Sequence, residues 1–291
     1  APLELSYNGT PRKAILSGAY IGNPTIIYDN TTTDAPKNAG DHTATVNIGG
    51  ATVSITYTIT PAKVTPESVT VADKIYDTKL YATASVDSVS GIVAGDDVIV
   101  KANAYFDSPD IGTDKDVSVS FSLIGDDAAN YELTTKKKTV KGNILPIPIE
   151  ILDVKIADKH YDGTTDATIT EIVVADSFDH IHVTINANAE FADANSGQNK
   201  DVKVSFTLEG AEKSLCKLNI TEGTFKGNIL TKSGAEVLAP VAGLTPDTVK
   251  KSDKETVQSV LDEFDLLLKD EGLTDAQKKD LTDSRKVAQA L

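Results

Sequence analysis

The chain has 291 residues and is 40% hydrophobic, a size and composition that suit two or three folded domains and exclude wholesale disorder. Its 43 acidic and 28 basic residues give a formal net charge of −15, so the average surface would repel phosphate groups, and we expect no nucleic-acid partner. No apolar stretch approaches the roughly 20 residues that a membrane span needs. The single cysteine, Cys216, excludes an internal disulfide.

The first 63 residues are predicted to form a small β unit. Strands are expected at residues 24–28, 43–48 and 52–59, and Gly49-Gly50 has the pattern of a tight hairpin turn. A unit of about 60 residues has only a marginal core, so we expect it to gain stability by packing against its neighbour.

An internal repeat dominates the middle of the chain. Residues 73–145 recur as residues 158–230 at a constant offset of 85, and 28 of the 73 aligned positions are identical. The identities include Asp73-Lys74 with Asp158-Lys159, and the stretch 141–145 with the stretch 226–230. This self-similarity predicts one structural module used twice, copy 1 and copy 2.

Each copy has the pattern of short β-strands. In copy 1, residues 98–106 and 117–123 are rich in β-formers, and the second stretch alternates apolar residues with serine, as a strand with one exposed face does. Residues 107–114 between them, and 192–199 in copy 2, have the composition of turns. We therefore predict a mainly β fold with small Ig-like or β-sandwich modules in a row, at residues 1–63, 64–147 and 148–232.

Residues 233–291 are predicted to form a short C-terminal α-helical hairpin. Apolar residues recur with helical spacing from Val257 to Leu268 after a Ser252–Glu255 capping pair, and Thr274 with Gln277 forms a second capping pair. Two helices joined near Gly272 would bury a thin seam, so a partial bundle or a docking hairpin is expected. The stretch 231–234 has the composition of a loose linker, which would let the tail swing.

Proline-bearing junctions connect the β modules. Residues 59–63 and 144–149 run from a last strand directly into a next first strand. Such junctions are stiffer than Gly/Ser linkers, so the modules are expected to stack end to end. Three modules of about 30–40 Å each would make a rod of about 100 Å.

The motifs of the two copies resemble the YDG-type repeat of bacterial surface proteins and adhesins. Copy 2 carries Lys159-His160-Tyr161-Asp162-Gly163-Thr164-Thr165, and copy 1 carries Gly125-Asp126-Asp127-Ala128-Ala129-Asn130-Tyr131. Copy 1 lacks the signature glycine at Thr78, and copy 2 has Leu215-Cys216 where the family usually has Asn-Tyr. Residues 1–63, with Tyr7-Asn8-Gly9-Thr10 and the stretch 38–46, are similar to the MBG-type β module that often accompanies YDG repeats.

The resemblance implies a non-enzymatic stalk or spacer segment of a bacterial cell-surface or secreted protein, as part of an adhesin. The alternative is a glycan- or protein-binding β-sandwich module that uses the loops at one end. We expect an extracellular, cell-surface location, a monomer, and a host or extracellular-matrix protein or glycan as a partner. No nucleophile–base–acid set or phosphate loop has supporting context, so neither catalysis nor a cofactor is expected.

Two groups of residues are candidates for binding a metal ion. Calcium favours the oxygen ligands offered by Asp107, Asp110 and Asp114 in copy 1 and by Asp193, Asn195 and Asp201 in copy 2. Neither spacing is that of an EF-hand, and Gly112 and Gly197 are equally explained as turn residues. His180 and His182 would share one face of a strand, as a zinc or copper pair requires, but no third ligand is evident, and exposed histidines explain them better.

An intramolecular Lys–Asn isopeptide bond is the other chemical candidate. Lys74 and Lys159 lie in first strands, whereas Asn143 and Asn228 lie in last strands. The reaction needs a neutral amine and a buried carboxylic acid close by. Neighbouring side chains of a strand point to opposite faces, so the acid that precedes each lysine is badly placed to assist, which argues against the bond.

Three further residues have structural explanations. Tyr76 and Tyr161 could stack on sugars, but a repeated Tyr-Asp at a strand end is better explained by a ring in the core and a carboxylate that caps the turn. Cys216 replaces Tyr131 of copy 1 and is predicted to be a small buried hydrophobe.

Overall fold

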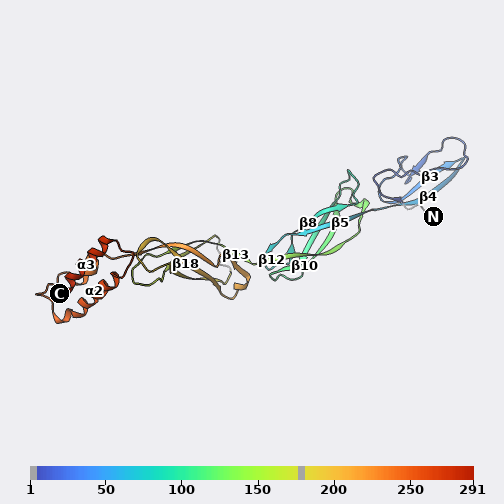
Figure 1. Cartoon of the computed structure of the whole chain (residues 1–291). Helices are drawn as coiled ribbons and strands as arrows, with labels where there is room; N and C mark the ends of the chain where they lie inside the picture. Colours follow the sequence, from blue (N-terminus) through green and yellow to red (C-terminus); the bar gives the residue numbers. More distant parts are fainter. Residues whose placement is uncertain (1–4, 176–180) are drawn as a thin grey trace. The chain divides into compact units, whose positions relative to one another are not determined.

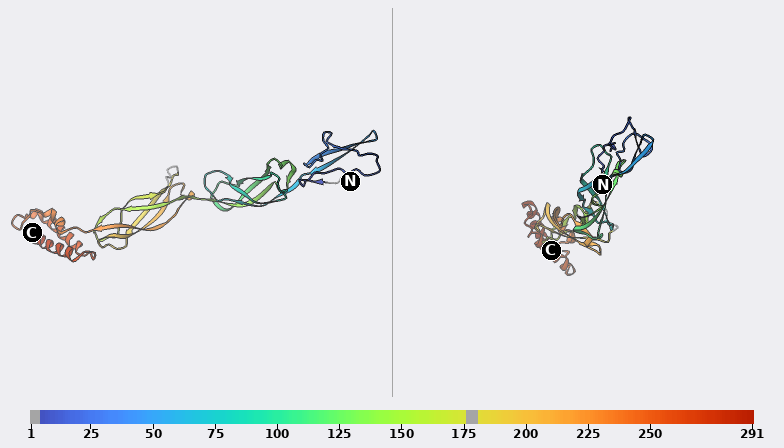
Figure 2. Two further views of the ribbon diagram at one scale, coloured as in Figure 1. Left: turned by 90° about the horizontal axis from the view of Figure 1, so that it is seen from above. Right: turned by 90° about the vertical axis from the view of Figure 1, so that its right-hand side faces the viewer.

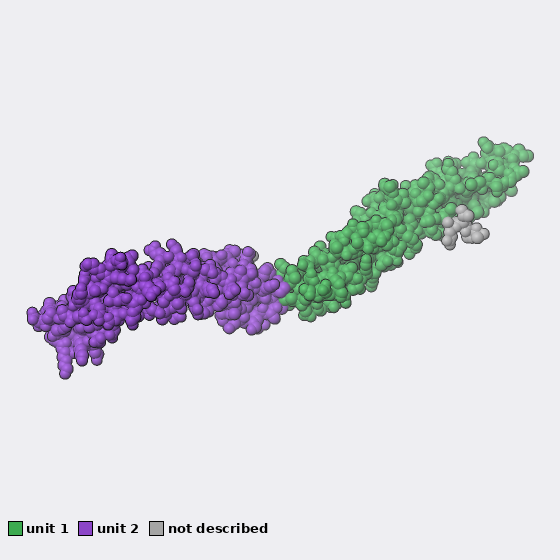
Figure 3. Space-filling model, in the orientation of Figure 1, with its two compact units in different colours: residues 1–145 green, residues 146–291 purple. Residues whose placement is uncertain are grey.

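A computed structural model describes residues 5–175 and 181–291 of the chain. The chain forms two compact units, residues 1–145 and 146–291, which Figures 1 and 3 show. Strands dominate both units, and helices occur at the end of the second. Among the described helices, none combines the length and apolar character that a membrane crossing requires.

The first module is a single four-stranded sheet. Its strands are β1 (Leu5–Ser6), β2 (Ile26–Tyr28), β3 (Gly40–Ile48) and β4 (Ala51–Thr60), in the order β1-β4-β3-β2. Strands β3 and β4 form a hairpin whose turn consists of Gly49 and Gly50, with φ values of 58° and 83°. Both values lie in the left-handed region that glycine reaches without strain, which confirms the predicted turn.

Copy 1 is a two-layer β-sandwich. Its elements are β5 (Ala62–Val71), β6 (Lys74–Ile75), β7 (Tyr81–Ala82), β8 (Ala84–Ser90), β9 (Ile99–Phe106), β10 (Gly112–Ile124), the one-turn helix η1 (Ala128–Asn130), β11 (Tyr131–Leu133) and β12 (Lys137–Leu145). A five-stranded sheet, β6-β12-β10-β9-β7, packs on a three-stranded sheet, β11-β5-β8. Val117 and Val119 are fully buried while Ser118 between them is exposed, as the alternation predicts.

Copy 2 repeats the sandwich with a divided first strand. Its elements are β13 (Ile147–Ile149), β14 (Ile151–Ile156), β15 (Lys159–His160), β16 (Ile169–Val174), β17 (Thr184–Phe191), β18 (Gly197–Glu209), η2 (Lys213–Leu215), β19 (Cys216–Leu218) and β20 (Glu222–Leu230). The larger sheet has the order β15-β20-β18-β17. Strands β13 and β14, which pair with β19 and β16, together take the place of the single strand β5. The predicted mainly β fold with sandwich modules is confirmed.

The predicted turns before β10 and β18 are only partly turns. Both strands begin at a glycine, Gly112 or Gly197, and contain a β-bulge immediately after it. The bulge residues Asp114 and Asn199 have φ values of 52° and 54°, a conformation that Asp and Asn tolerate better than most side chains. The two glycines are therefore strand residues at a bulge, and the sequence pattern alone did not distinguish this from a loop.

The tail contains the two predicted helices and one more. They are α2 (Lys254–Leu267) and α3 (Asp275–Gln289), which lie side by side at the end of the second unit (Figure 2). A short helix, α1 (Gly234–Leu238), and two one-turn helices, η3 (Ala239–Val241) and η4 (Lys251–Asp253), precede them. Phe264, Leu267 and Leu281 are fully buried in the core that α1, α2 and α3 share.

The helix caps only partly follow the prediction. The Thr274–Gln277 capping box is present at α3. The predicted Ser252–Glu255 pair is wrong, because Asp253 accepts a hydrogen bond from the Lys250 N–H, and α2 starts without a side-chain cap. A third capping box, Ser233 with Glu236, starts α1 and orders the segment that the sequence predicts to be a loose linker.

Candidate functional site

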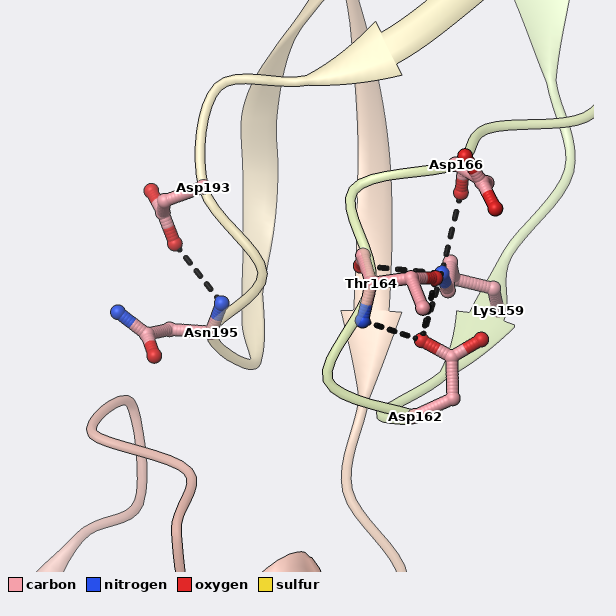
Figure 4. Close-up of polar contacts among 6 residues, drawn as sticks. All are labelled: Lys159, Asp162, Thr164, Asp166, Asp193 and Asn195. Carbon is pink, nitrogen blue, oxygen red and sulfur yellow. Dashed lines mark hydrogen bonds and ion pairs between the residues drawn. The ribbon is translucent and has the colours of Figure 1, made fainter.

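The repeated lysine of each copy closes a loop. The Lys74 amine donates hydrogen bonds to the carbonyl oxygens of Lys79 and Tyr81, at 2.8 and 2.9 Å, and pairs with Asp77 at 2.8 Å. In copy 2, Lys159 makes the same contacts with the carbonyl oxygens of Thr164 and Asp166 and with Asp162 (Figure 4). We call each of these arrangements a lysine clamp. In both clamps the lysine amine donates its hydrogen bonds to the loop that follows its strand.

The asparagines of the proposed isopeptide pairs have other partners. The Asn143 amide donates to Asp73 at 2.7 Å, and its oxygen accepts from the backbone N–H of the bulge residue Asp114 at 3.0 Å. Asn228 repeats both contacts, with Asp158 at 2.8 Å and the N–H of Asn199 at 2.9 Å. Each asparagine thus fixes a β-bulge, while the lysines Lys74 and Lys159 are held by their clamps. The isopeptide bond stays a candidate, and an intact-mass measurement tests it.

Lysines contact the acidic loops, which we define as residues 107–116 and 192–201. Asp193 pairs with Lys200 at 2.6 Å, and this hydrogen bond holds the pKa of the carboxyl below its usual value. In copy 1 the equivalent lysine, Lys115, donates to Ser108 at 2.8 Å and lies 3.7 Å from Asp107. The later carboxylates of the loops, Asp116 and Asp201, pair with Lys141 at 2.7 Å and with Lys226 at 2.5 Å.

The remaining calcium candidates have no shared geometry. Asp110 and Asp114 are exposed, and Asn195 turns toward the helical tail, accepting a hydrogen bond from the Glu271 N–H at 3.3 Å. Over residues 5–175 and 181–291, no three His, Cys, Asp or Glu side chains gather as a metal site would need. His182 is exposed and lies 3.2 Å from Glu212, while His180 lies outside the described residues.

The Tyr-Asp motifs have the geometry that the sequence predicts. Tyr76 packs against the core of copy 1 and Tyr161 against that of copy 2. Asp77 accepts a hydrogen bond from the Lys79 N–H, and Asp162 accepts one from the Thr164 N–H, both at 2.9 Å, so each carboxylate caps its turn. Cys216 is buried, which raises the pKa of its thiol.

A tyrosine–aspartate cluster joins the first module to copy 1, and the sequence analysis missed it. The hydroxyls of Tyr7 and Tyr131 both donate to one oxygen of Asp96, at 2.7 and 2.5 Å, and the two rings meet edge to face with centroids 5.4 Å apart. Burial and the bond to Asp96 raise the pKa of Tyr131 to about 12 and that of Tyr7 further still. The same bonds lower the pKa of Asp96.

Further contacts cross the same junction. The Ala39 N–H donates to the Asn130 side chain at 2.8 Å, and a Cβ on Gly9 would lie 3.0 Å from Val93. Tyr7 and Ile59 belong to the same buried cluster as the core of copy 1. The first module and copy 1 therefore share a packed interface, as expected for a unit whose own core is marginal. The sequence contains one indication of this interface, because copy 1 has Asn130-Tyr131 where copy 2 has Leu215-Cys216.

The helical tail is docked on copy 2. The buried Asp270 accepts hydrogen bonds from the N–H groups of Ser196 and Gly272, both at 2.9 Å. Gly272 lies so close to copy 2 that a Cβ there would be 2.2 Å from the Ser196 carbonyl oxygen. Lys232 pairs with Glu263 of α2 at 2.6 Å. These contacts correct the expectation of a swinging tail.

The outer faces of the two larger sheets differ. In copy 2 this face is hollowed, with a volume of about 520 Å³ lined by charged and polar side chains: Asn188, Glu190, Lys203, Ser205, Glu222 and Thr224. In copy 1 the equivalent face carries exposed tyrosines, Tyr81 and Tyr105, which pair across neighbouring strands. The two copies therefore differ in the charge and aromatic character of this surface.

Among the solved structures, 16 chains match this one, including the three that follow. The chain is 13% identical to domains 4–9 of surface layer protein SbsC, covering 74% of this chain and 40% of that one with a TM-score of 0.17. It is 15% identical to domains 1–6 of the same protein, covering 72% of this chain and 35% of that one with a TM-score of 0.19. It is 9% identical to the I-band fragment I67–I69 from titin, covering 75% of this chain and 84% of that one with a TM-score of 0.23. The chain thus spans well under half of either surface-layer chain. TM-scores this low support no inference about fold or function.

Comparison with known sequences identifies the repeated modules. A search of the curated proteins finds no match. The YDG domain family matches residues 60–139 and 146–214, which together make up more than half of the chain and correspond to copy 1 and most of copy 2. The chain therefore belongs to the YDG domain family.

Proposed function

We propose that residues 1–232 form a non-enzymatic stalk or spacer of a bacterial cell-surface or secreted protein, as part of an adhesin. Residues 1–63 would be an MBG-type module at the N-terminal end of this stalk. Its task is geometric: the modules hold another part of the same protein at a set distance from the envelope, outside the cell.

The junction between the first module and copy 1 is the observation that carries this proposal. Strand β4 ends at Thr60 and β5 begins at Ala62, so Pro61 alone separates the two modules. Around this proline lie the buried Ile59 and the Tyr7–Asp96–Tyr131 cluster. A short, proline-bearing connection with a packed, hydrogen-bonded interface fixes the angle between neighbours, which a spacer needs and a flexible linker does not provide.

The chemistry of the repeated residues also favours a structural role. The lysines of both clamps, the asparagines at both bulges and the aspartates of the Tyr-Asp motifs are all engaged in bonds that hold loops and bulges. These polar residues are identical in the two copies, and each is used to maintain shape. A role in catalysis would require the same groups to face a substrate.

Small-angle X-ray scattering of the full chain tests the stalk. A compact globule of 291 residues would have a radius of gyration of about 19 Å. A rod of about 100 Å, built from three modules in line, would give about 29 Å or more. A value near that of the globule would refute the stalk. Protease added to intact cells of the source organism should cleave the full-length protein, and complete protection would refute the extracellular location.

A further inference from the structure

The outer face of copy 1 carries a straight row of four side chains. Tyr81 of β7 pairs with Tyr105 of β9, Tyr105 pairs with Ser118 of β10, and Ser118 pairs with Thr139 of β12. Directly opposed residues of neighbouring strands project to the same side, so two tyrosines and two hydroxyl side chains stand in line. With strands about 4.8 Å apart, this row spans about 14 Å.

Both tyrosines are open to solvent and one is held in place. Tyr81 and Tyr105 are each 55% exposed, an unusual degree for neighbouring aromatic side chains in a chain with only 5% aromatic residues. The Lys74 amine lies 4.4 Å over the Tyr81 ring and is itself fixed by its clamp, which orders the ring without covering it. An exposed aromatic pair with one fixed ring is suited to stacking on a flat, partly apolar ligand such as a sugar ring.

The surroundings of the row are polar and basic. Alternation along the strands places Lys101 and Asn103 of β9, Ser120 of β10 and Lys137 of β12 on the same face as the tyrosines. Lys101 and Lys137 are exposed, and the nearby Asp116 is neutralised by Lys141 at 2.7 Å. A chain of net charge −15 thus has a locally basic surface around its exposed tyrosines.

Copy 2 has acidic residues at three of these positions. Asp166 and Glu190 replace the two tyrosines and pair with each other in the same register, and Glu222 replaces Lys137. The sandwich therefore forms with either the aromatic and basic residues of copy 1 or the acidic residues of copy 2, so neither group is needed for folding. This contrast within one chain indicates that the face of copy 1 has a role that the face of copy 2 lacks.

We infer that this face binds an acidic polysaccharide, with sugar rings on Tyr81 and Tyr105 and sugar carboxylates near Lys101 and Lys137. The serine, threonine and asparagine side chains of the face would hydrogen-bond sugar hydroxyls. Charge complementarity selects the acidic class, because the exposed Lys101 and Lys137 share this face with the rings. The nearby carboxylates of Asp107 and Asp116 lie against Lys115 and Lys141. This inference goes beyond the proposed spacer role and does not depend on the shape of the stalk.

The test is binding of the full chain to polygalacturonate, a uronic-acid polymer, with the neutral polymer dextran in parallel, measured by affinity electrophoresis and calorimetry. The double substitution Tyr81→Asp with Tyr105→Glu installs the residues of copy 2 and should weaken binding at least tenfold, as loss of buried aromatic anchors does. Lys137→Glu should also weaken binding, and rising salt should weaken binding of the unsubstituted chain. Tyr20→Ala and Lys251→Glu, which change an exposed tyrosine and an exposed lysine elsewhere, should leave it unchanged.

Four outcomes would overturn the inference. They are no binding of polygalacturonate, unchanged binding by the double variant, equal binding of dextran, or self-association of the chain in sedimentation that the double variant abolishes. The last would assign the face to a second copy of the protein. Circular dichroism shows whether each variant is folded, and the presence of the same residues in copy 2 makes folding the expected result.

Discussion

The tyrosine–aspartate cluster predicts how strongly the first module is held on copy 1. Tyr7 is 3% exposed, its hydroxyl donates to Asp96 and its ring contacts that of Tyr131. Tyr7→Phe keeps the ring contact and removes the hydroxyl. Because Asp96 keeps the bond from Tyr131 and has access to water, the loss should be smaller than for a fully buried bond to a charged group. We expect about 1 kcal/mol, the value of an ordinary hydrogen bond.

Tyr7→Ala removes the ring as well. Truncation of a buried aromatic side chain costs about 3–5 kcal/mol, and the value here should be near 3, because the cavity opens at a junction that can relax. These energies correspond to about fivefold and more than a hundredfold changes in the equilibrium for opening the junction.

Hydrogen exchange at one amide measures this opening directly. The Ala39 N–H donates to the Asn130 side chain across the junction, so its exchange requires the two modules to separate or the module to unfold. Exchange at Ala39 should rise about fivefold in Tyr7→Phe and more than a hundredfold in Tyr7→Ala. The Ser196 amide, which donates to Asp270 in the other unit, serves as the internal control. Unchanged exchange at Ala39 in Tyr7→Ala would refute the argument that the cluster holds the junction.

The lysine clamps, the acidic loops, Tyr131 and the docked tail each lead to one further prediction. The intact mass should equal the mass calculated from the unmodified sequence, because the clamp lysines and the bulge asparagines have separate partners. A mass lower by one or two ammonia molecules would show isopeptide bonds instead. Calcium or a chelator should leave the melting temperature unchanged, since lysines contact the acidic loops, and a calcium-dependent rise would contradict this. The free energy of unfolding of the first unit in urea should be constant below pH 10 and should fall as the pH rises toward about 12. The reason is that folding raises the pKa of Tyr131 to about 12, so the unfolded chain loses this proton first. A free energy that does not change over this range would contradict the argument. Gly272→Ala should release the tail from copy 2 and expose residues 231–234 to protease. Gly112→Ala, where an added Cβ would meet only the Lys115 side chain at 3.4 Å, should not; equal protection in both would show that the tail is not held there.

The parts of the fold that depend on neighbouring residues were predictable from the sequence. The Gly49-Gly50 hairpin, the alternation of Val117, Ser118 and Val119, and the Thr274–Gln277 capping box each lie within a few residues, and each is present. The Ser252–Glu255 cap failed because Asp253 competes for the same helix start, and local pattern does not rank two candidate caps only one residue apart.

The candidate sites depended on which strands become neighbours, and this the sequence did not reveal. Asp96 is 89 residues from Tyr7 and 35 from Tyr131, and no periodicity connects them. Tyr81 and Tyr105 lie in separate strands whose pairing only the sheet order shows. Sequence patterns directed attention to the repeated Asp, Lys and Asn residues, which the structure uses in clamps, turns and bulges.

Differences between the two copies mark function better than their identities. The identical positions include Phe106 with Phe191 and Val117 with Val202, all buried, so the duplication preserved what the sandwich needs to fold. At the module end, Asp96 of copy 1 corresponds to the buried Ile181 of copy 2, so the hydrogen-bonded tyrosine cluster has an apolar counterpart there. Residues at the ends and on the outer faces of a module can be substituted without disturbing its core. A protein that copies its interior and varies these two surfaces can keep one stable module while giving the copies different neighbours and different surface chemistry.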